Sequence, residues 1–165
     1  MATITFKGAP VHTVGELPGK GASAPDFVLV GLGLEEVQLS GYAGKKKVLN
    51  IFPSVDTGIC AASVRRFNSE AADLKGVAVL NISADLPFAH KRFCGAEGIE
   101  NTHSLSTFRG TFARDYGVEM LDGPLKGLCS RAVVVLDADN VVLYTEQVRE
   151  VVQEPDYAAA LAALR

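Results

Sequence analysis

The chain has 165 residues, of which 48% are hydrophobic and 21% are charged, as is typical of one globular domain covering residues 1–165. Its formal net charge of −3 offers no basic field that would attract nucleic acid or an anionic membrane surface. No apolar run approaches the roughly 20 residues that span a bilayer, and the N-terminus lacks the apolar core of a signal peptide. We therefore expect no nucleic-acid partner, no membrane association and a cytoplasmic location.

The predicted elements begin with a hairpin, in which residues 4–6 and 11–14 flank a turn. Further strands are predicted at residues 27–30, 36–39, 47–52, 77–83, 132–136 and 141–145. Helices are predicted at residues 61–74, 87–94, 107–116 and 156–164. The last two strands are joined by a turn-forming sequence and should pair antiparallel. This order indicates an α/β sandwich with a mixed sheet, compatible with a thioredoxin-like fold that carries an N-terminal β-hairpin.

Cys60 lies at the junction between a predicted buried strand and a predicted helix. Apolar residues recur at helical spacing after it, at Val64, Phe67, Ala71 and Leu74. The cysteine is therefore expected in or just before the first helical turn, where free N–H groups and the helix dipole favour an anion. This placement favours the thiolate, which is the reactive form of cysteine. The alternative is that Cys60 is a buried small hydrophobic residue.

The run from Pro53 to Cys60, with Thr57 between them, resembles the active-site signature of the peroxiredoxins, Pro-x-x-x-Thr-x-x-Cys. The wider sequence is similar to that of the bacterial thiol peroxidases, at residues 48–65, 82–89, 92–98 and 123–128. The resemblance covers nearly the whole chain and implies the thioredoxin-like fold. It also implies that Cys60 attacks a peroxide and that Thr57 is catalytic, although Thr57 could instead cap the helix. Pro53 is expected to fix the loop and cover the pocket.

Arg131 stands directly before the strand predicted at residues 132–136. A charged residue in this position is often only a solvated strand end. The resembling family, however, places its catalytic arginine at the start of this strand, and a guanidinium stays charged and offers several donors in one plane. We therefore expect Arg131 to contact the Cys60 thiolate, and we expect Arg65 and Arg66 to lie on the surface.

Cys94 ends the helix predicted at residues 87–94, with Gly95 and Gly98 as helix-stop signals. A purely structural cysteine is one alternative. The resemblance implies instead that Cys94 condenses with a Cys60 sulfenic acid to form an intramolecular disulfide. Because the two cysteines occupy different helices, both helix ends are expected to unwind during this step.

The remaining cysteine and histidine positions give weaker signals. Cys129 shares a face with Arg131 if the strand extends back that far, but we expect a packed, inert thiol. His90 lies four residues before Cys94 and could assist it, but we expect a surface histidine. The three cysteines and three histidines of the chain form no pair at metal-ligand spacing, so we expect no metal or other cofactor.

The sequence thus predicts a thiol-dependent peroxidase that reduces hydrogen peroxide and organic hydroperoxides. The resemblance implies a thioredoxin-type protein as reductant and a homodimer as the working state. A thiol–disulfide oxidoreductase is disfavoured because Cys60 has no C-x-x-C partner. A redox-sensing or chaperone-like binding protein with the same thiols is the third alternative, and it would need only stoichiometric oxidation.

Overall fold

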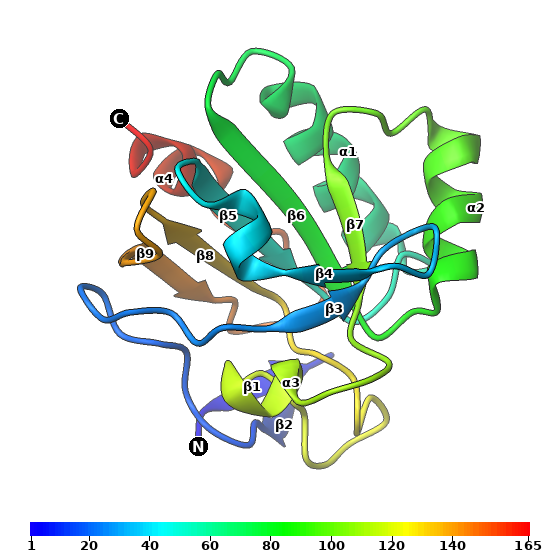
Figure 1. Cartoon of the computed structure of the whole chain (residues 1–165). Coiled ribbons are helices and arrows are strands. Elements are labelled where there is room, and N and C mark those ends of the chain that lie inside the picture. Colours follow the sequence, from blue (N-terminus) through cyan, green and yellow to red (C-terminus); the bar gives the residue numbers. More distant parts are fainter.

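A seven-stranded mixed sheet runs through the middle of the computed structural model, which describes residues 1–165 (Figure 1). Its strands are β3 (Val28–Val30), β4 (Glu36–Gln38), β5 (Lys46–Ile51), β6 (Val77–Ser83), β7 (His103–Ser106), β8 (Ala132–Leu136) and β9 (Val142–Gln147). They lie in the order β4-β3-β7-β6-β5-β8-β9. The three central strands β7, β6 and β5 are parallel, and the strands outside them pair antiparallel. The predicted mixed α/β architecture is therefore confirmed.

Helices cover both faces of this sheet because its central strands are apolar on both sides. Helices α1 (Gly58–Ala71) and α4 (Tyr157–Ala162) pack on one face, where Phe67 and Tyr157 contact valines of the sheet. The apolar core on the other face includes Phe112 of the short helix α3 (Phe112–Asp115), Tyr116 after it, and Phe27 and Leu39, which flank β3 and β4. Helix α2 (Pro87–Glu97) lies beside α1 (Figure 1) and shares an apolar cluster with it. A 3-10 helix, η1 (Leu39–Tyr42), follows β4.

The predicted N-terminal hairpin is present as β1 (Thr3–Phe6) and β2 (Ala9–His12), which pair antiparallel. Lys7 and Gly8 at its tip take positive φ values of 51° and 82°, as a type I′ turn requires. The hairpin lies outside the main sheet, at the lower end of the view in Figure 1. It is anchored by Ile4 and Val11, which pack against Met120 and Val151.

One prediction of local structure is wrong, and one strand is missing from the prediction. The helix predicted at residues 107–116 exists only as α3, because the chain turns at Gly110, whose φ is +88°, before the helix can begin. Strand β7 was not predicted, since its polar sequence His-Ser-Leu-Ser carries little strand signal of its own. The other predicted elements are all present, with ends that differ by three residues or fewer.

The pairing register brings three chain segments to one edge of the sheet. Ile51, the last residue of β5, lies opposite Ile82 of the parallel strand β6 and opposite Ala132 of the antiparallel strand β8. The loop after β5, the loop after β6 and the residue before β8 must therefore meet at this edge. These segments hold Pro53 to Cys60, Asp85 and Arg131.

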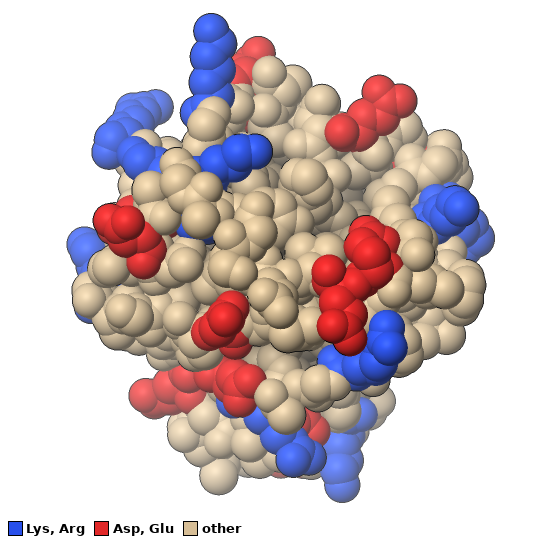
Figure 2. Space-filling model, viewed as in Figure 1, with Lys and Arg blue, Asp and Glu red and all other residues tan.

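No helix of the chain combines the length and the apolar character needed to cross a membrane. Acidic and basic side chains are interspersed over the face shown in Figure 2, with uncharged surface between them.

Candidate active site

Cys60 is the third residue of α1, within its first turn as predicted. The first intrahelical hydrogen bond runs from the N–H of Ala61 to the carbonyl of Thr57, at 3.0 Å. The N–H groups of residues 58–60 therefore have no partner within the helix and create a positive potential around the thiol. The cysteine itself is fully buried, at 0% exposure. A buried thiol at this position needs a specific partner if it is to carry charge.

Arg131 supplies that partner. Its Nη2 donates to the Cys60 sulfur at 3.1 Å, and its Nε donates to the carbonyl of Val151 at 2.8 Å. The side chain is 2% exposed and forms no ion pair with any carboxylate in the chain. A buried guanidinium without a carboxylate stabilises negative charge on the sulfur that it contacts. Arg131 is thus not a solvated strand end, and its buried Nη1 still lacks a hydrogen-bond partner.

Thr57 occupies the N-cap position of α1 but does not cap the helix with its side chain. Its Oγ1 instead donates to the carbonyl of Ser54 at 3.0 Å. The lone pairs of Oγ1 therefore remain free to accept a hydrogen bond. Pro53 is buried at the start of the same loop. The structure therefore brings Pro53, Thr57, Cys60 and Arg131 together, as the sequence predicted.

A cavity of about 160 Å³ opens beside these residues. Most of its wall is apolar, and part of it comes from the N-terminal hairpin; the lining residues are Phe6, Pro53, Thr57, Gly58, Ile59, Leu125, Arg131, Val151 and Val152. The guanidinium of Arg131 is the one charged group among them. The cavity can therefore admit a small molecule with one polar end and an apolar remainder.

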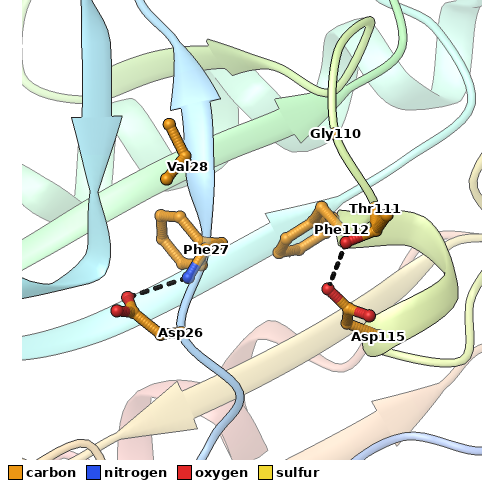
Figure 3. Close-up of a pocket in the computed structure, with 7 residues that line it drawn as sticks. All are labelled: Asp26, Phe27, Val28, Gly110, Thr111, Phe112 and Asp115. Carbon is orange, nitrogen blue, oxygen red and sulfur yellow. Dashed lines mark hydrogen bonds between the residues drawn. The ribbon is translucent and has the colours of Figure 1, made fainter.

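A larger cavity, of about 350 Å³, lies between the start of β3 and helix α3 (Figure 3). It is lined by Asp26, Phe27, Val28, Gly110, Thr111, Phe112 and Asp115. The carboxylates of Asp26 and Asp115 accept hydrogen bonds from two other lining residues, Phe27 and Thr111. None of these residues is a cysteine, histidine or arginine, so this cavity has no group that could attack or polarise a substrate as Cys60 and Arg131 can.

Cys94 lies in the last part of α2 and is partly exposed. Its sulfur is 3.2 Å from the hydroxyl oxygen of Ser104 on β7. Gly98 ends the helix in the left-handed conformation, with φ of 65°, as predicted, whereas Gly95 lies inside the helix and is not a stop. Cys94 and Cys60 are both free thiols, and both contact one apolar cluster, which contains Phe52, Val55, Val64, Phe93 and Ile99.

Cys129 lies three residues before β8 and forms an isolated bridge with Glu119. It is 1% exposed in the main core, and burial raises the pKa of its thiol to about 12. A thiol that stays protonated at neutral pH is a poor nucleophile, which agrees with the expected inert role. Arg65 and Arg66 lie on the surface as expected, in ion pairs with Glu97 and Glu70.

The expectation of a surface histidine at position 90 is wrong. His90 is 1% exposed, and its Nε2 lies 3.1 Å from the hydroxyl oxygen of Ser83. Burial lowers the pKa of this imidazole. The helix turns this position inward because α2 lies along β7, beside α1, and one of its faces is buried.

Nowhere in the chain do three His, Cys, Asp or Glu side chains lie closely enough together to hold a metal ion.

Sequence reasoning missed Asp85 as part of the site. Its carboxylate accepts hydrogen bonds from the Ser54 hydroxyl at 2.7 Å and from the Val55 N–H at 2.9 Å, both in the loop before Cys60. The sequence signal was only partial: Asp85 follows the strand predicted at residues 77–83, which is the next predicted strand along the chain after the one before Cys60, but the pairing of the two strands is seen only in the structure. The carboxyl ends of neighbouring parallel strands meet at one edge.

The fold and this thiol site together define the class of the protein. The chain belongs to the Redoxin family, whose model matches residues 19–161. The structure is similar to that of a peroxiredoxin-like protein from Aquifex aeolicus, with a TM-score of 0.94 and 36% identity over 99% of this chain and 96% of that one. The predicted thioredoxin-like fold is thereby confirmed.

Its relatives narrow the class further. The chain is 56% identical, over 164 residues and 99% of both chains, to the thiol peroxidases of Mycobacterium tuberculosis and Mycobacterium bovis. It is also similar in structure to the thiol peroxidase of Chromobacterium violaceum, with a TM-score of 0.88 and 27% identity over 98% of this chain and 94% of that one. The predicted resemblance to bacterial thiol peroxidases is confirmed, and the chain is an enzyme of this peroxidase group.

Proposed function

We propose that the protein reduces hydrogen peroxide and organic hydroperoxides through a sulfenic acid on Cys60, which Cys94 converts to an intramolecular disulfide. A dithiol protein of the thioredoxin type then reduces the disulfide. The observation that carries this proposal is the contact of 3.1 Å between Arg131 Nη2 and the Cys60 sulfur in a buried site.

In the first step the Cys60 thiolate attacks one peroxide oxygen. A sulfur–oxygen bond forms, the oxygen–oxygen bond breaks, and the second oxygen leaves as hydroxide or alkoxide and takes up a proton. The developing charge needs donors that are already in place. Arg131 offers its unpartnered Nη1, and the Thr57 oxygen can accept a hydrogen bond from a protonated peroxide oxygen. Pro53 keeps this loop in position over the cavity.

In the second step the Cys94 thiolate attacks the sulfur of the Cys60 sulfenic acid. A disulfide forms as the sulfur–oxygen bond breaks, and the oxygen leaves as hydroxide, which takes up the proton that Cys94 released and becomes water. The shared apolar cluster places both thiols on the same side of the molecule, at α1 and α2. Because each thiol is held by its own helix, the first turn of α1 and the last turn of α2 must unwind before the sulfurs can meet.

The reductant in the third step must come from outside the chain. Cys129 is the one remaining thiol, and its burial with a pKa of about 12 prevents it from attacking the disulfide. A dithiol protein can open the disulfide in two exchange steps and leave with the oxidising equivalents. We place this cycle in the cytoplasm, where thiol reductants keep cysteines reduced.

We also propose that the working state is a homodimer. Three large apolar side chains near the active-site edge are exposed: Leu86 at 50%, Phe88 at 66% and Phe108 at 46%. The Ser106 hydroxyl joins two of their segments, since it donates to the carbonyl of Asp85 and accepts from the N–H of Phe108. A second copy is the partner that would cover such a surface. Sedimentation of the wild type and of Phe88→Asp tests this, with a dimer expected for the first and a monomer for the second.

The test of the proposed function is steady-state peroxide consumption with thioredoxin, its reductase and NADPH, run with hydrogen peroxide and with alkyl hydroperoxides of increasing size. We expect sustained turnover with both classes, because the cavity wall is largely apolar. A redox sensor would consume one equivalent of peroxide and stop. A thiol–disulfide oxidoreductase would reduce protein disulfides and leave the peroxide intact.

A further inference from the structure

Asp85 is the centre of a hydrogen-bond network that the catalytic steps above do not use. One carboxylate oxygen, Oδ1, accepts from the Ser54 hydroxyl at 2.7 Å. The other, Oδ2, accepts from the Val55 N–H at 2.9 Å and from the Ser83 hydroxyl at 2.5 Å. Its backbone carbonyl accepts from the Ser106 hydroxyl at 2.5 Å. Its own N–H donates to the hydroxyl oxygen of Ser83 at 3.2 Å, so every polar group of Asp85 is engaged.

The network extends from Asp85 to His90 through one hydroxyl group. Because Ser83 donates its single proton to Asp85, its oxygen acts as an acceptor toward the Nε2 of His90, 3.1 Å away. His90 therefore carries its proton on Nε2, and its buried Nδ1 has no partner. With no proton on Nδ1 the ring is neutral, in agreement with a pKa that burial lowers.

The two ends of this network belong to the two segments that must move in the resolving step. Ser54 and Val55 lie in the loop that leads to Cys60. His90 lies on α2, one helical turn before Cys94. Asp85 therefore ties the loop of the attacking thiol to the helix of the second thiol, through atoms that are buried or partly buried.

We propose that Asp85 is a positioning residue for disulfide formation, whose hydrogen bonds hold the Cys60 loop and α2 in the arrangement that reacts with peroxide and must be broken before Cys94 reaches Cys60. This inference rests on the proposed function. Asp85 then sets how long the Cys60 sulfenic acid survives, and so how the acid divides between the disulfide and further oxidation by a second peroxide to sulfinic acid.

The experiment compares the wild type with Asp85→Asn after one equivalent of peroxide. An amide cannot accept all three hydrogen bonds, because an NH₂ group, which donates and does not accept, replaces one of the two carboxylate oxygens. The folded arrangement is weakened relative to the rearranged one, so we expect disulfide formation to become about tenfold faster. Rapid quenching with acid, thiol alkylation and mass spectrometry give this rate. The fraction of sulfinic acid under excess peroxide should fall correspondingly.

A second background separates positioning from general damage to the site. In Cys94→Ser protein no disulfide competes, so the rate of sulfinic acid formation reports only how well Cys60 is presented to peroxide. We expect Asp85→Asn to change that rate much less than it changes disulfide formation in the parent. Ser54→Ala removes one bond to Oδ1 without touching the carboxylate, and should speed disulfide formation by a few-fold.

Asp56→Asn is the matched control. The Arg92–Asp56 pair, at 2.7 Å, joins the same loop to the same helix, but both side chains are about 60% exposed. Exposed pairs contribute little, so this variant should change the disulfide rate less than twofold. If the wild type forms the Cys60–Cys94 disulfide but Asp85→Asn and Ser54→Ala do so at the wild-type rate, the inference is wrong and the proposed function stands. If the wild type forms no such disulfide, both fail.

Discussion

Cys60 and Cys129 are equally shut off from solvent, at 0% and 1% exposure, yet their surroundings are opposite. Cys60 faces the unpaired N–H groups of a helix start and the guanidinium of Arg131. Cys129 lies in the apolar core, where burial, with a smaller contribution from the charges of Glu119 and Asp85, raises the pKa of its thiol to about 12. Burial strengthens whichever electrostatic partner a thiol has, because the local dielectric is low.

The comparison also separates burial from access. The sulfur of Cys60 is covered, but its partner Arg131 and its neighbours Thr57 and Pro53 form the wall of a cavity. Cys129 packs between residues of the main core. A cavity of about 400 Å³ is lined by its neighbours Thr107 and Glu119, but Cys129 itself does not line it. A small peroxide can therefore approach the first thiol from the cavity, whereas reaching the second requires the core to open.

The different roles of Cys60 and Cys129 can be tested by replacing each thiol separately. We expect Cys60→Ser to abolish peroxide consumption, because a serine hydroxyl is not ionised at neutral pH and cannot attack the peroxide. Cys129→Ser should consume peroxide at nearly the wild-type rate. Turnover in the coupled thioredoxin assay measures both. Substantial turnover by Cys60→Ser, or its loss in a folded Cys129→Ser protein, would reverse the roles assigned to the two thiols.

The next largest effect should come from the charge that distinguishes Cys60. Removing the guanidinium in Arg131→Ala takes away the partner of the thiolate and a donor to the leaving oxygen. By analogy with the loss of one oxyanion donor we expect a rate lower by about 100- to 1000-fold.

Arg131→Lys is the control, since it keeps the charge but loses the planar array of donors. It should react faster than Arg131→Ala but more slowly than the wild type, because Lys cannot bond to the sulfur, to the carbonyl of Val151 and to a peroxide in one plane. Wild-type rates in both variants would show that Arg131 has no part in the chemistry.

The features of Cys60 that set it apart could largely be predicted from the sequence, because they are local. The strand, the loop from Pro53 to Thr57 and the helix start follow one another in a single run. Arg131 was found because the strand after it is strongly apolar and because the resembling family has an arginine there. Both signals can be recognised in the sequence without knowledge of the tertiary packing.

What could not be predicted depends on contacts between distant segments. His90 was expected on the surface because its own helix has only a weak apolar pattern, and burial against Phe52 and Ser83 becomes visible only when α2 is docked. Strand β7 is recognised by its pairing with β6 rather than by its composition. Asp85 needed the register of β5 and β6, which places the loops after these strands side by side.

A third, smaller effect concerns Cys94, which is more exposed than either of the two buried thiols and whose sulfur contacts the hydroxyl of Ser104. In Cys94→Ser we expect Cys60 to react with the first equivalent of peroxide at nearly the wild-type rate. The sulfenic acid should then persist and proceed to sulfinic acid under excess peroxide. Mass spectrometry of the intact chain follows these states. A disulfide from Cys60 to Cys129, or between two chains, would contradict the proposed pairing.

The smallest expected effect tests the inert member of the pair through stability. The pKa of Cys129 rises from 9.0 to about 12 on folding, so above pH 9 the unfolded chain releases a proton that the folded chain keeps. The stability contributed by the protonated thiol is therefore complete below pH 9 and is lost as the pH rises toward 12.

The Cys129→Ser variant lacks this pH dependence. Between pH 9 and pH 10 the free energy of unfolding should fall by about 1 kcal/mol more in the wild type than in the variant. Urea unfolding under reducing conditions measures the difference, and the buried tyrosines, which titrate in both proteins, cancel in it. Parallel pH profiles would show that the thiol of Cys129 ionises as easily in the folded core as in the unfolded chain, and would remove the physical basis for calling it inert.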